Sequence, residues 1–207
     1  MCAIVGSFDK AKLVELVKLN TYRGAHSWSL SEYNIKTGNV ETQKGLGDFD
    51  ESALESLTEG NYYIAHTQAP TTDAKSDDNI HPSKYEDSLL WHNGIIKDYF
   101  VTKMQDGLNR PHQPWDTALL NEWISKGMAL DDVDGTFSCL RYRKGKLTLF
   151  RNEISPMFID EDWNLSSTKF EGSKPTKPGA KLWMDFAFKK LQEIKTFKTK
   201  ENPYFFG

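Results

Sequence analysis

The chain has 207 residues, and its 26 Lys and Arg against 29 Asp and Glu give a formal net charge of −3 at pH 7. This balance argues against nucleic acid or a membrane surface as a partner, because both are bound through clustered basic side chains. Two cysteines are too few for a disulfide framework or a thiolate zinc site, and no run approaches the roughly 18 apolar residues of a membrane span, so we expect a cytoplasmic protein without a metal.

Apolar periodicity indicates the elements of the first part of the chain. Leu13, Leu16 and Val17 recur on one helical face, and polar and apolar residues alternate on both sides of a turn at 36–39. A long polar loop at 71–85 separates two apolar strands, which is typical of a functional region. We expect strands at 2–8, 28–35, 38–46, 62–67 and 88–92, and helices at 10–20 and 50–57.

Strands dominate the remainder. Ala118, Leu119 and Trp123 form one apolar helical face. Runs of strands broken by few helices predict an α+β class with largely antiparallel sheets. We expect a helix at 115–125, strands at 136–142, 146–151 and 157–160, a main domain over residues 1–188, and a C-terminal tail over 189–207 that either docks a partner or packs on its own domain.

Three short elements together supply the groups that an amide-cleaving site needs. Cys2, once Met1 is removed, offers a thiol nucleophile and an α-amine whose pKa of about 7.7–8.0 suits a base. Asn93 and Gly94 offer two N–H donors for a developing oxyanion, and Asp116 offers a carboxylate for a substrate ammonium. Each element also has a purely structural interpretation: a buried strand cysteine, a His-Asn-Gly turn and a helix N-cap.

The order and spacing of these and other motifs resemble the class II glutamine amidotransferases, the N-terminal-nucleophile hydrolases typified by the glutaminase domain of glucosamine-6-phosphate synthase. The resemblance extends over about residues 2–182. The motifs that carry it are MCAIVGSF at 1–8, YRGAHS at 22–27, IAHT at 64–67, NIHP at 79–82, WHNGIIKDY at 91–99, DT at 116–117 and RNEISPM at 151–157.

This resemblance implies a fold and a set of roles. The fold would be a four-layer αββα sandwich of mainly antiparallel sheets. Cys2 would attack the side-chain amide of glutamine, form a γ-glutamyl thioester and release ammonia, with Asn93 and Gly94 as the oxyanion hole. The implied substrate-binding residues are Asp116, Gln68, Thr71, Thr72 and Arg23, and no cofactor is implied.

Two positions depart from the family pattern: Gln68, and Ala25-His26, where the family has an Asp before the Ser. The family places an Arg, which grips the glutamine α-carboxylate, where this chain has Gln68. A charge-assisted hydrogen bond is worth roughly 1.5–3 kcal/mol against about 1 for a neutral one, so the exchange predicts about tenfold weaker binding. A solvated loop residue is the alternative interpretation of Gln68. We interpret Cys139 as a core thiol, His81 as fixing its loop, and His66 and His92 as satisfied strand residues.

These observations favour a glutaminase subunit that supplies ammonia to a synthase or ligase in trans, because the chain has no room for an acceptor domain after residue 182. Two alternatives stay open. Gln68 motivates an amidase of the same type that acts on a γ-glutamyl or other amide. The second alternative is a non-catalytic binding or assembly domain, although this role gives no reason for Cys2, Asn93, Gly94 and Asp116 all to be present.

Overall fold

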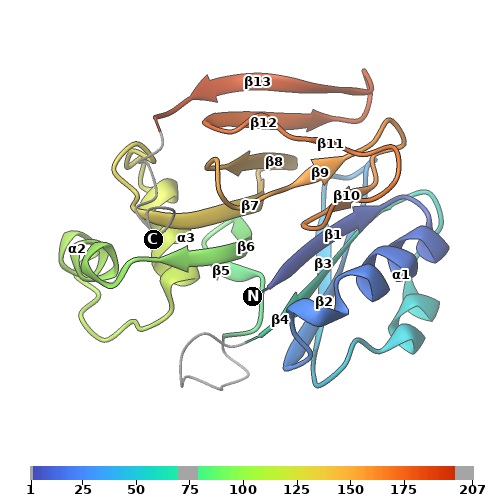
Figure 1. Ribbon diagram of the computed structural model, residues 1–207, viewed down its shortest axis with the longest axis horizontal. Coiled ribbons are helices and arrows are strands. Elements are labelled where there is room, and N and C mark those ends of the chain that lie inside the picture. The colour runs from blue at the N-terminus through green and yellow to red at the C-terminus, as the bar shows by residue number, and fades with distance from the viewer. Residues whose placement is uncertain (1, 70–78, 199–207) are drawn as a thin grey trace. The chain divides into compact units, whose positions relative to one another are not determined.

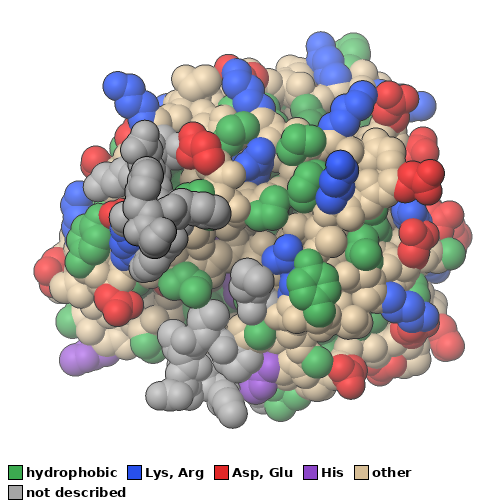
Figure 2. Space-filling model, viewed as in Figure 1, with side chains coloured by type: hydrophobic (Ala, Val, Ile, Leu, Met, Phe, Trp, Pro, Cys, Tyr) green, Lys and Arg blue, Asp and Glu red, His purple; other side chains and the backbone are tan. Residues whose placement is uncertain are grey.

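The computed structural model describes residues 2–69 and 79–198, and the chain forms two compact units (Figure 1). Unit 1 comprises residues 1–82 and 156–176, and unit 2 comprises residues 83–155 and 177–207. Each unit is therefore assembled from two separate stretches of sequence. On the surface visible in Figure 2, acidic and basic side chains are interspersed, as the near balance of charges in the sequence leads one to expect.

Unit 1 contains a seven-stranded antiparallel sheet in the order β11-β9-β10-β1-β4-β2-β3. Its helix α1 (Lys10–Leu19) begins at an Asp9 cap, whose carboxylate accepts the Lys12 N–H, and two 3₁₀ turns follow, η1 (Thr21–Arg23) and η2 (Glu51–Ser56). The strands are β1 (Ala3–Ser7), β2 (Ser27–Tyr33), β3 (Val40–Leu46), β4 (Tyr62–Gln68), β9 (Phe158–Ile159), β10 (Leu165–Ser166) and β11 (Lys174–Pro175).

The two faces of this sheet differ in character. Leu13 of α1 packs in one core with Val5 and Ala65, which share a face of the sheet. Because successive strand side chains point to opposite faces, His66 and Gln68 lie on the other face. Alternation along β1 and β4 thus separates an apolar face under α1 from a face that carries polar side chains.

Unit 2 contains a six-stranded antiparallel sheet in the order β13-β12-β8-β7-β6-β5. Helix α3 (Asp116–Ser125) packs on β5 and β6, and helix α2 (Asp98–Leu108) packs on α3 (Figure 1). Both helices share one hydrophobic core with β6, β7 and β8. The strands are β5 (Ser83–Tyr85), β6 (Ser88–Ile96), β7 (Gly135–Arg143), β8 (Lys146–Arg151), β12 (Ala180–Asp185) and β13 (Lys190–Thr196).

The two antiparallel sheets with their helices confirm the predicted α+β class. Several details differ from the sequence-based expectations: for example, the helix expected at 50–57 is the 3₁₀ turn η2, and the short strands β5, β10 and β11 were not expected. Strand β6 runs through Ile96 instead of ending at 92, so the turn interpretation of His-Asn-Gly is wrong: Gly94 pairs with Phe137 inside the ladder. Asp116 is the first residue of α3, after the cap residue Trp115. Helix α2 was not expected, because its buried residues form only a narrow stripe of three side chains, Phe100, Met104 and Leu108.

Part of the predicted tail belongs to the sheet. Residues 190–196 form β13, which pairs along its length with β12, and Phe197 packs in the core of unit 2. Residues 199–207 lie outside the described part of the chain, so a docking role for the tail stays a prediction. Among residues 2–69 and 79–198, no helix is long and apolar enough to cross a membrane.

Candidate active site

Cys2 lies at the start of β1, in unit 1. Its side chain is 8% exposed, and its thiol donates a long contact of 3.8 Å to the carbonyl oxygen of Ala69. The β1–β4 register pairs Ala3 with Thr67, which places Cys2 opposite Gln68 just beyond the last registered pair. The apolar, β-branched run after Cys2 forms the strand, and the antiparallel pairing brings residue 2 beside the end of β4.

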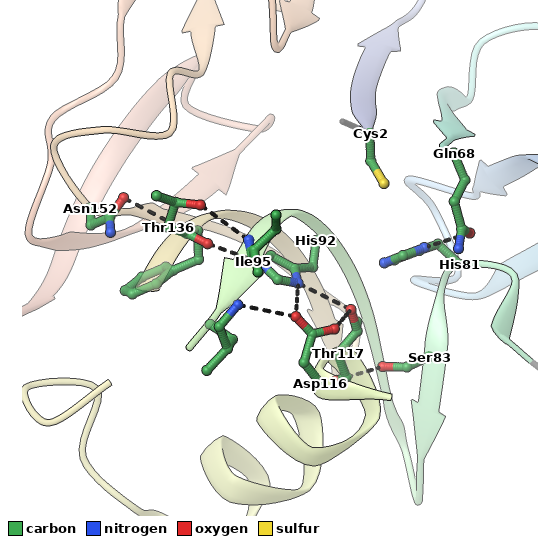
Figure 3. Close-up of polar contacts among 12 residues, drawn as sticks. Cys2, Gln68, His81, Ser83, His92, Ile95, Asp116, Thr117, Thr136 and Asn152 are labelled. Carbon is green, nitrogen blue, oxygen red and sulfur yellow. Dashed lines mark hydrogen bonds and ion pairs between the residues drawn. The ribbon is translucent and has the colours of Figure 1, made fainter. Parts of the chain in front are cut away.

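Gln68 is the last residue of β4 and is not a solvated loop residue. Its Oε1 accepts a hydrogen bond from Nδ1 of His81 at 3.1 Å (Figure 3). It accepts a second from the Ser27 hydroxyl at 3.4 Å. The His81 ring in turn stacks on that of His66, with 3.9 Å between ring centroids. Since these contacts occupy the carboxamide oxygen, the two N–H donors of Gln68 are the end that remains for a ligand.

The other predicted substrate-binding residues of unit 1 are placed less directly. Arg23 donates from Nε to the Thr168 hydroxyl at 3.0 Å and from Nη2 to the carbonyl oxygen of Ser167 at 3.2 Å. Among the described residues, none accepts from its Nη1. Thr71 and Thr72 lie outside the described residues, and their predicted role stays a prediction.

Asn93 and Gly94 lie within β6, in unit 2. Asn93 is only 4% exposed, yet no described residue hydrogen-bonds its side-chain carboxamide. Gly94 has φ +154°, and a Cβ at this position would lie 1.9 Å from the carbonyl oxygen of Thr136. The position therefore requires glycine for both its conformation and its close approach to β7. A buried, uncommitted amide beside such a glycine is the arrangement that oxyanion donors need.

The chain leaving Gly94 is held by a polar cluster. Lys97 forms an ion pair with Asp134 at 3.1 Å, and the Tyr99 hydroxyl donates a hydrogen bond to the same carboxylate. That hydrogen bond, with a small contribution from burial, raises the pKa of Tyr99 to about 12. Tyr99 therefore stays a neutral donor at physiological pH, and Asp134 anchors the segment between β6 and α2.

Asp116 begins α3 with its side chain 23% exposed. Its Oδ2 accepts the backbone N–H of Ile96 at 3.2 Å, and its Oδ1 lies 3.3 Å from the Thr117 hydroxyl (Figure 3). A carboxylate in the first helical turn is stabilised by the positive end of the helix dipole. It is also accessible enough to meet a ligand cation.

His92 is a satisfied strand residue, as expected, and its partners, which the sequence did not indicate, are Thr117, Asp116 and the carbonyl oxygen of Thr136. Sequence reasoning assigned His81 only to its loop, although His81 orients Gln68. No sequence signal could identify these contacts, because the partners are 13 to 44 residues away along the chain.

The remaining cysteine is confirmed as a core residue. Cys139 is fully buried, and burial, with a contribution from Asp116, raises the pKa of its thiol well above its ordinary value. A neutral, inaccessible thiol is not a nucleophile. In the part of the chain that the structure describes, no group of three or more His, Cys, Asp or Glu side chains is arranged to hold a metal ion.

In sequence, the chain is similar to isomerizing glutamine–fructose-6-phosphate aminotransferases. It is 33% identical over 108 residues to that of Rhizobium meliloti, covering 50% of this chain and 18% of that one. It is 36% identical over 106 residues to that of Clostridium acetobutylicum, covering 48% and 17%. The chain therefore matches less than a fifth of the length of these relatives. No protein-family model matches the chain.

In structure, the chain is similar to a Bacillus subtilis glutamine phosphoribosylpyrophosphate amidotransferase complexed with ADP and GMP. The TM-score is 0.73 at 15% identity, over 98% of this chain and 50% of that one. An allosteric regulatory enzyme of purine biosynthesis gives 0.70 at 14% identity, over 97% and 50%. A class-II glutamine aminotransferase domain protein from Silicibacter pomeroyi gives 0.50 at 10% identity, over 96% and 99%.

At these identities the structural likeness shows the fold alone, and the sequence similarity to the aminotransferases adds homology to it. The two findings agree with the motifs at Cys2, Asn93, Gly94 and Asp116. Together they show that the chain is homologous over about half its length to glutamine–fructose-6-phosphate aminotransferases and has the N-terminal-nucleophile hydrolase fold of the solved glutamine amidotransferases.

Proposed function

We propose that this domain hydrolyses the side-chain amide of glutamine through a thioester on Cys2. The observation that carries the proposal is the pair Asn93 and Gly94: a residue only 4% exposed whose carboxamide hydrogen-bonds no described residue, followed by a glycine that β7 approaches too closely for any side chain. Two such N–H donors side by side can stabilise an oxyanion. The relatives named above are an aminotransferase and an amidotransferase of glutamine, which supports the same substrate.

The proposed reaction begins with removal of Met1, which gives Cys2 a free α-amine. The amine accepts the thiol proton as Sγ attacks the amide carbon, and the oxyanion forms against the donors of Asn93 and Gly94. The amine then gives the proton to the departing nitrogen, so that ammonia leaves and a γ-glutamyl thioester remains. Water, deprotonated by the same amine, hydrolyses the thioester to glutamate and restores the thiol.

Substrate binding follows from the charges of glutamine. Asp116 would hold the α-ammonium, and the Gln68 N–H donors, with Arg23, Thr71 and Thr72, would hold the α-carboxylate. We further propose that the ammonia passes to an acceptor synthase or ligase in trans. The relatives are enzymes named for the transfer of nitrogen from glutamine, which supports this proposal without identifying the acceptor.

The test combines intact mass with ammonia release from L-glutamine. We expect active protein to lack Met1, the Cys2→Ala variant to release no ammonia, and the matched Cys139→Ala variant to keep its activity because that thiol is buried in the core. Trapping with a glutamine analogue that carries an electrophile should add mass to Cys2. Retention of Met1 in active protein, or ammonia release by Cys2→Ala, would contradict the proposed mechanism.

Gln68 supports a second candidate, an amidase for γ-glutamyl conjugates or other amides. A neutral carboxamide attracts a carboxylate less strongly than an Arg does. Gln68 therefore selects less strongly for substrates that carry a free α-carboxylate. Turnover of L-glutamine should be compared with that of γ-glutamyl amides and of glutamine blocked at its α-carboxylate. Preference for free glutamine would reject the amidase. If none of these amides is cleaved by protein lacking Met1, a non-catalytic binding domain is the remaining interpretation.

A further inference from the structure

The His92 ring lies at the centre of a hydrogen-bonded chain in unit 2 (Figure 3). Its Nδ1 is 3.0 Å from the Thr117 hydroxyl and 4.0 Å from Oδ2 of Asp116, and its Nε2 is 3.4 Å from the carbonyl oxygen of Thr136. The same Thr117 hydroxyl is 3.3 Å from Oδ1 of Asp116. His92 and Thr117 are buried, at 2% and 1% exposed, whereas Asp116 reaches solvent.

The chemistry of these groups restricts where the protons lie. The carbonyl oxygen of Thr136 can only accept, so Nε2 of His92 carries hydrogen in either charge state. When the ring is neutral, Nδ1 has a lone pair and accepts the Thr117 hydroxyl. When the ring is protonated, Nδ1 donates to that hydroxyl, whose hydrogen then turns to Oδ1 of Asp116. One hydroxyl has one hydrogen, so Thr117 cannot donate to both partners at once.

The surroundings of the Asp116 carboxylate differ between these two states of His92. With neutral His92, Asp116 accepts the Ile96 N–H and has Oδ1 open to an incoming cation. With protonated His92, Asp116 gains the Thr117 hydrogen bond and a positive charge 4.0 Å away. Both changes reduce the attraction of the carboxylate for another cation.

We propose that His92 is a positioning residue whose protonation, transmitted by the Thr117 hydroxyl, sets the affinity of Asp116 for the ammonium of an amino-acid ligand. The inference rests on the proposed function only in taking Asp116 as the ammonium site. By linkage the effect is reciprocal: lowering the pH weakens ligand binding, and ligand binding lowers the pKa of His92.

The groups that face His92 leave this coupling intact. From α3 the titratable neighbour is Asp116, and from β7 it is Cys139, which lies directly opposite His92 in the ladder. Burial keeps the Cys139 thiol neutral by raising its pKa. A ligand cation bound to Asp116 offsets the negative charge that lies 4.0 Å from Nδ1 of His92.

The direct test is an NMR titration of the His92 imidazole in the Cys2→Ala protein, which cannot turn over. We expect saturating L-glutamine to lower the pKa of His92. The control ligand is glutaramic acid, which has the same amide and carboxylate but no ammonium, and it should leave that pKa unchanged. An unchanged pKa with glutamine, or equal shifts with both ligands, would overturn the inference without involving catalysis.

Variants at residue 117 separate the relay from simple packing. In the Cys2→Ala background we expect the Kd for L-glutamine to rise about fivefold or more as the pH falls from about 8 to about 5.5, across the usual titration range of histidine. Thr117→Val should flatten this dependence, and Thr117→Ser should retain it. The matched control is Thr176→Val, which removes a buried hydroxyl bonded to the Met157 carbonyl in unit 1. It should leave the pH dependence of Kd as it is in the Cys2→Ala protein.

The outcomes also distinguish this inference from the proposed function. Suppose that the wild type releases ammonia from glutamine but the affinity of the Cys2→Ala protein for L-glutamine does not vary with pH. The role proposed for His92 is then wrong, whereas the proposed glutamine hydrolysis is unaffected. If the protein neither binds nor hydrolyses glutamine, the proposed function fails, and the inference fails with it. If Thr117→Val does not fold, the titration of His92 with the two ligands still decides.

Discussion

At the scale of single residues, the conformation of Gly94 is the sharpest constraint on the site. Its φ of +154° lies where side chains are disfavoured, and the carbonyl of Thr136 occupies the space of a Cβ. The motif His-Asn-Gly suggests a turn when taken alone, because these residue types tolerate such conformations in turns. The structure uses the same tolerance inside strand β6, where Gly94 pairs with Phe137 and the chain does not reverse.

We predict that Gly94→Ala lowers the free energy of unfolding by more than an unfavourable backbone conformation does alone, which is about 1–3 kcal/mol. The matched control is Gly127→Ala in the same unit, where φ is +80° and a Cβ would meet nothing within 4 Å. Urea unfolding of both variants measures the difference. Equal losses for the two would show that the contact with Thr136 is relieved without cost.

At the scale of elements, each end of α3 meets a suitable charge, its own Asp116 at the start and Arg143 of β7 at the end. Asp116 lies in its first turn, and at its last turn Arg143 donates to the carbonyl oxygen of Ser125 at 3.3 Å. A fully buried Asn121 in the middle of the helix donates to the carbonyl oxygens of Ser83 and Ser88. These directional contacts fix the register of α3 on the sheet, and hence the position of Asp116, more tightly than apolar packing would.

Glu122 on the same helix makes the stability of unit 2 pH-dependent. Burial raises the pKa of this carboxyl, but hydrogen bonds from Lys126 and Arg110 outweigh burial, so its pKa lies below the ordinary value of 4.5. A lowered folded-state pKa means that the stabilisation is complete above the unfolded value and is lost as the pH falls through the folded one.

We therefore predict that Glu122→Gln has a lower free energy of unfolding than the wild type at pH 7. This difference should become smaller as the pH falls below 4.5. Urea midpoints over that range measure the effect. The control Glu55→Gln changes an exposed carboxylate and should follow the wild type throughout. A gap that is independent of pH would mean that Glu122 acts through shape rather than charge.

At the scale of the whole molecule, neither unit is a continuous segment. The chain passes from unit 1 to unit 2 and back before finishing in unit 2. The returning segment, residues 156–176, completes unit 1 by pairing β10 with β1 and by placing the Asn164 carboxamide 2.6 Å from the buried Ser7 hydroxyl. Residues 2–82 alone would leave these polar groups buried without their partners.

We predict that a fragment of residues 2–82 shows no cooperative unfolding transition, because unpaired buried polar groups cost about 1–3 kcal/mol each against a total stability of about 5–15 kcal/mol. The same fragment joined to residues 156–176 by a flexible linker should regain a transition. Near-ultraviolet circular dichroism with thermal melting tests both. A cooperative melt of 2–82 alone would show that β9–β11 are dispensable.

The sequence by itself determined the elements with strong local patterns and the residue types of the site. A short apolar, β-branched run gave β1, period-two alternation gave β2 and β3, and an apolar stripe gave α3, because these patterns record how each element is buried. Helix α2 was not recoverable, since three apolar residues on a narrow stripe resemble a polar loop. The motif order Cys2, Asn93-Gly94 and Asp116 indicated the family without any coordinates.

Only the tertiary structure decided how those residues are supported. The contact of Gln68 with His81 and the chain from His92 through Thr117 to Asp116 depend on pairing between strands and on helix α3 packing on β6. Local sequence fixes which face a side chain occupies, but it does not specify which distant side chain meets it there. Hydrogen-bond geometry and burial are properties of the folded chain, and the proton relay proposed for His92 arises from them.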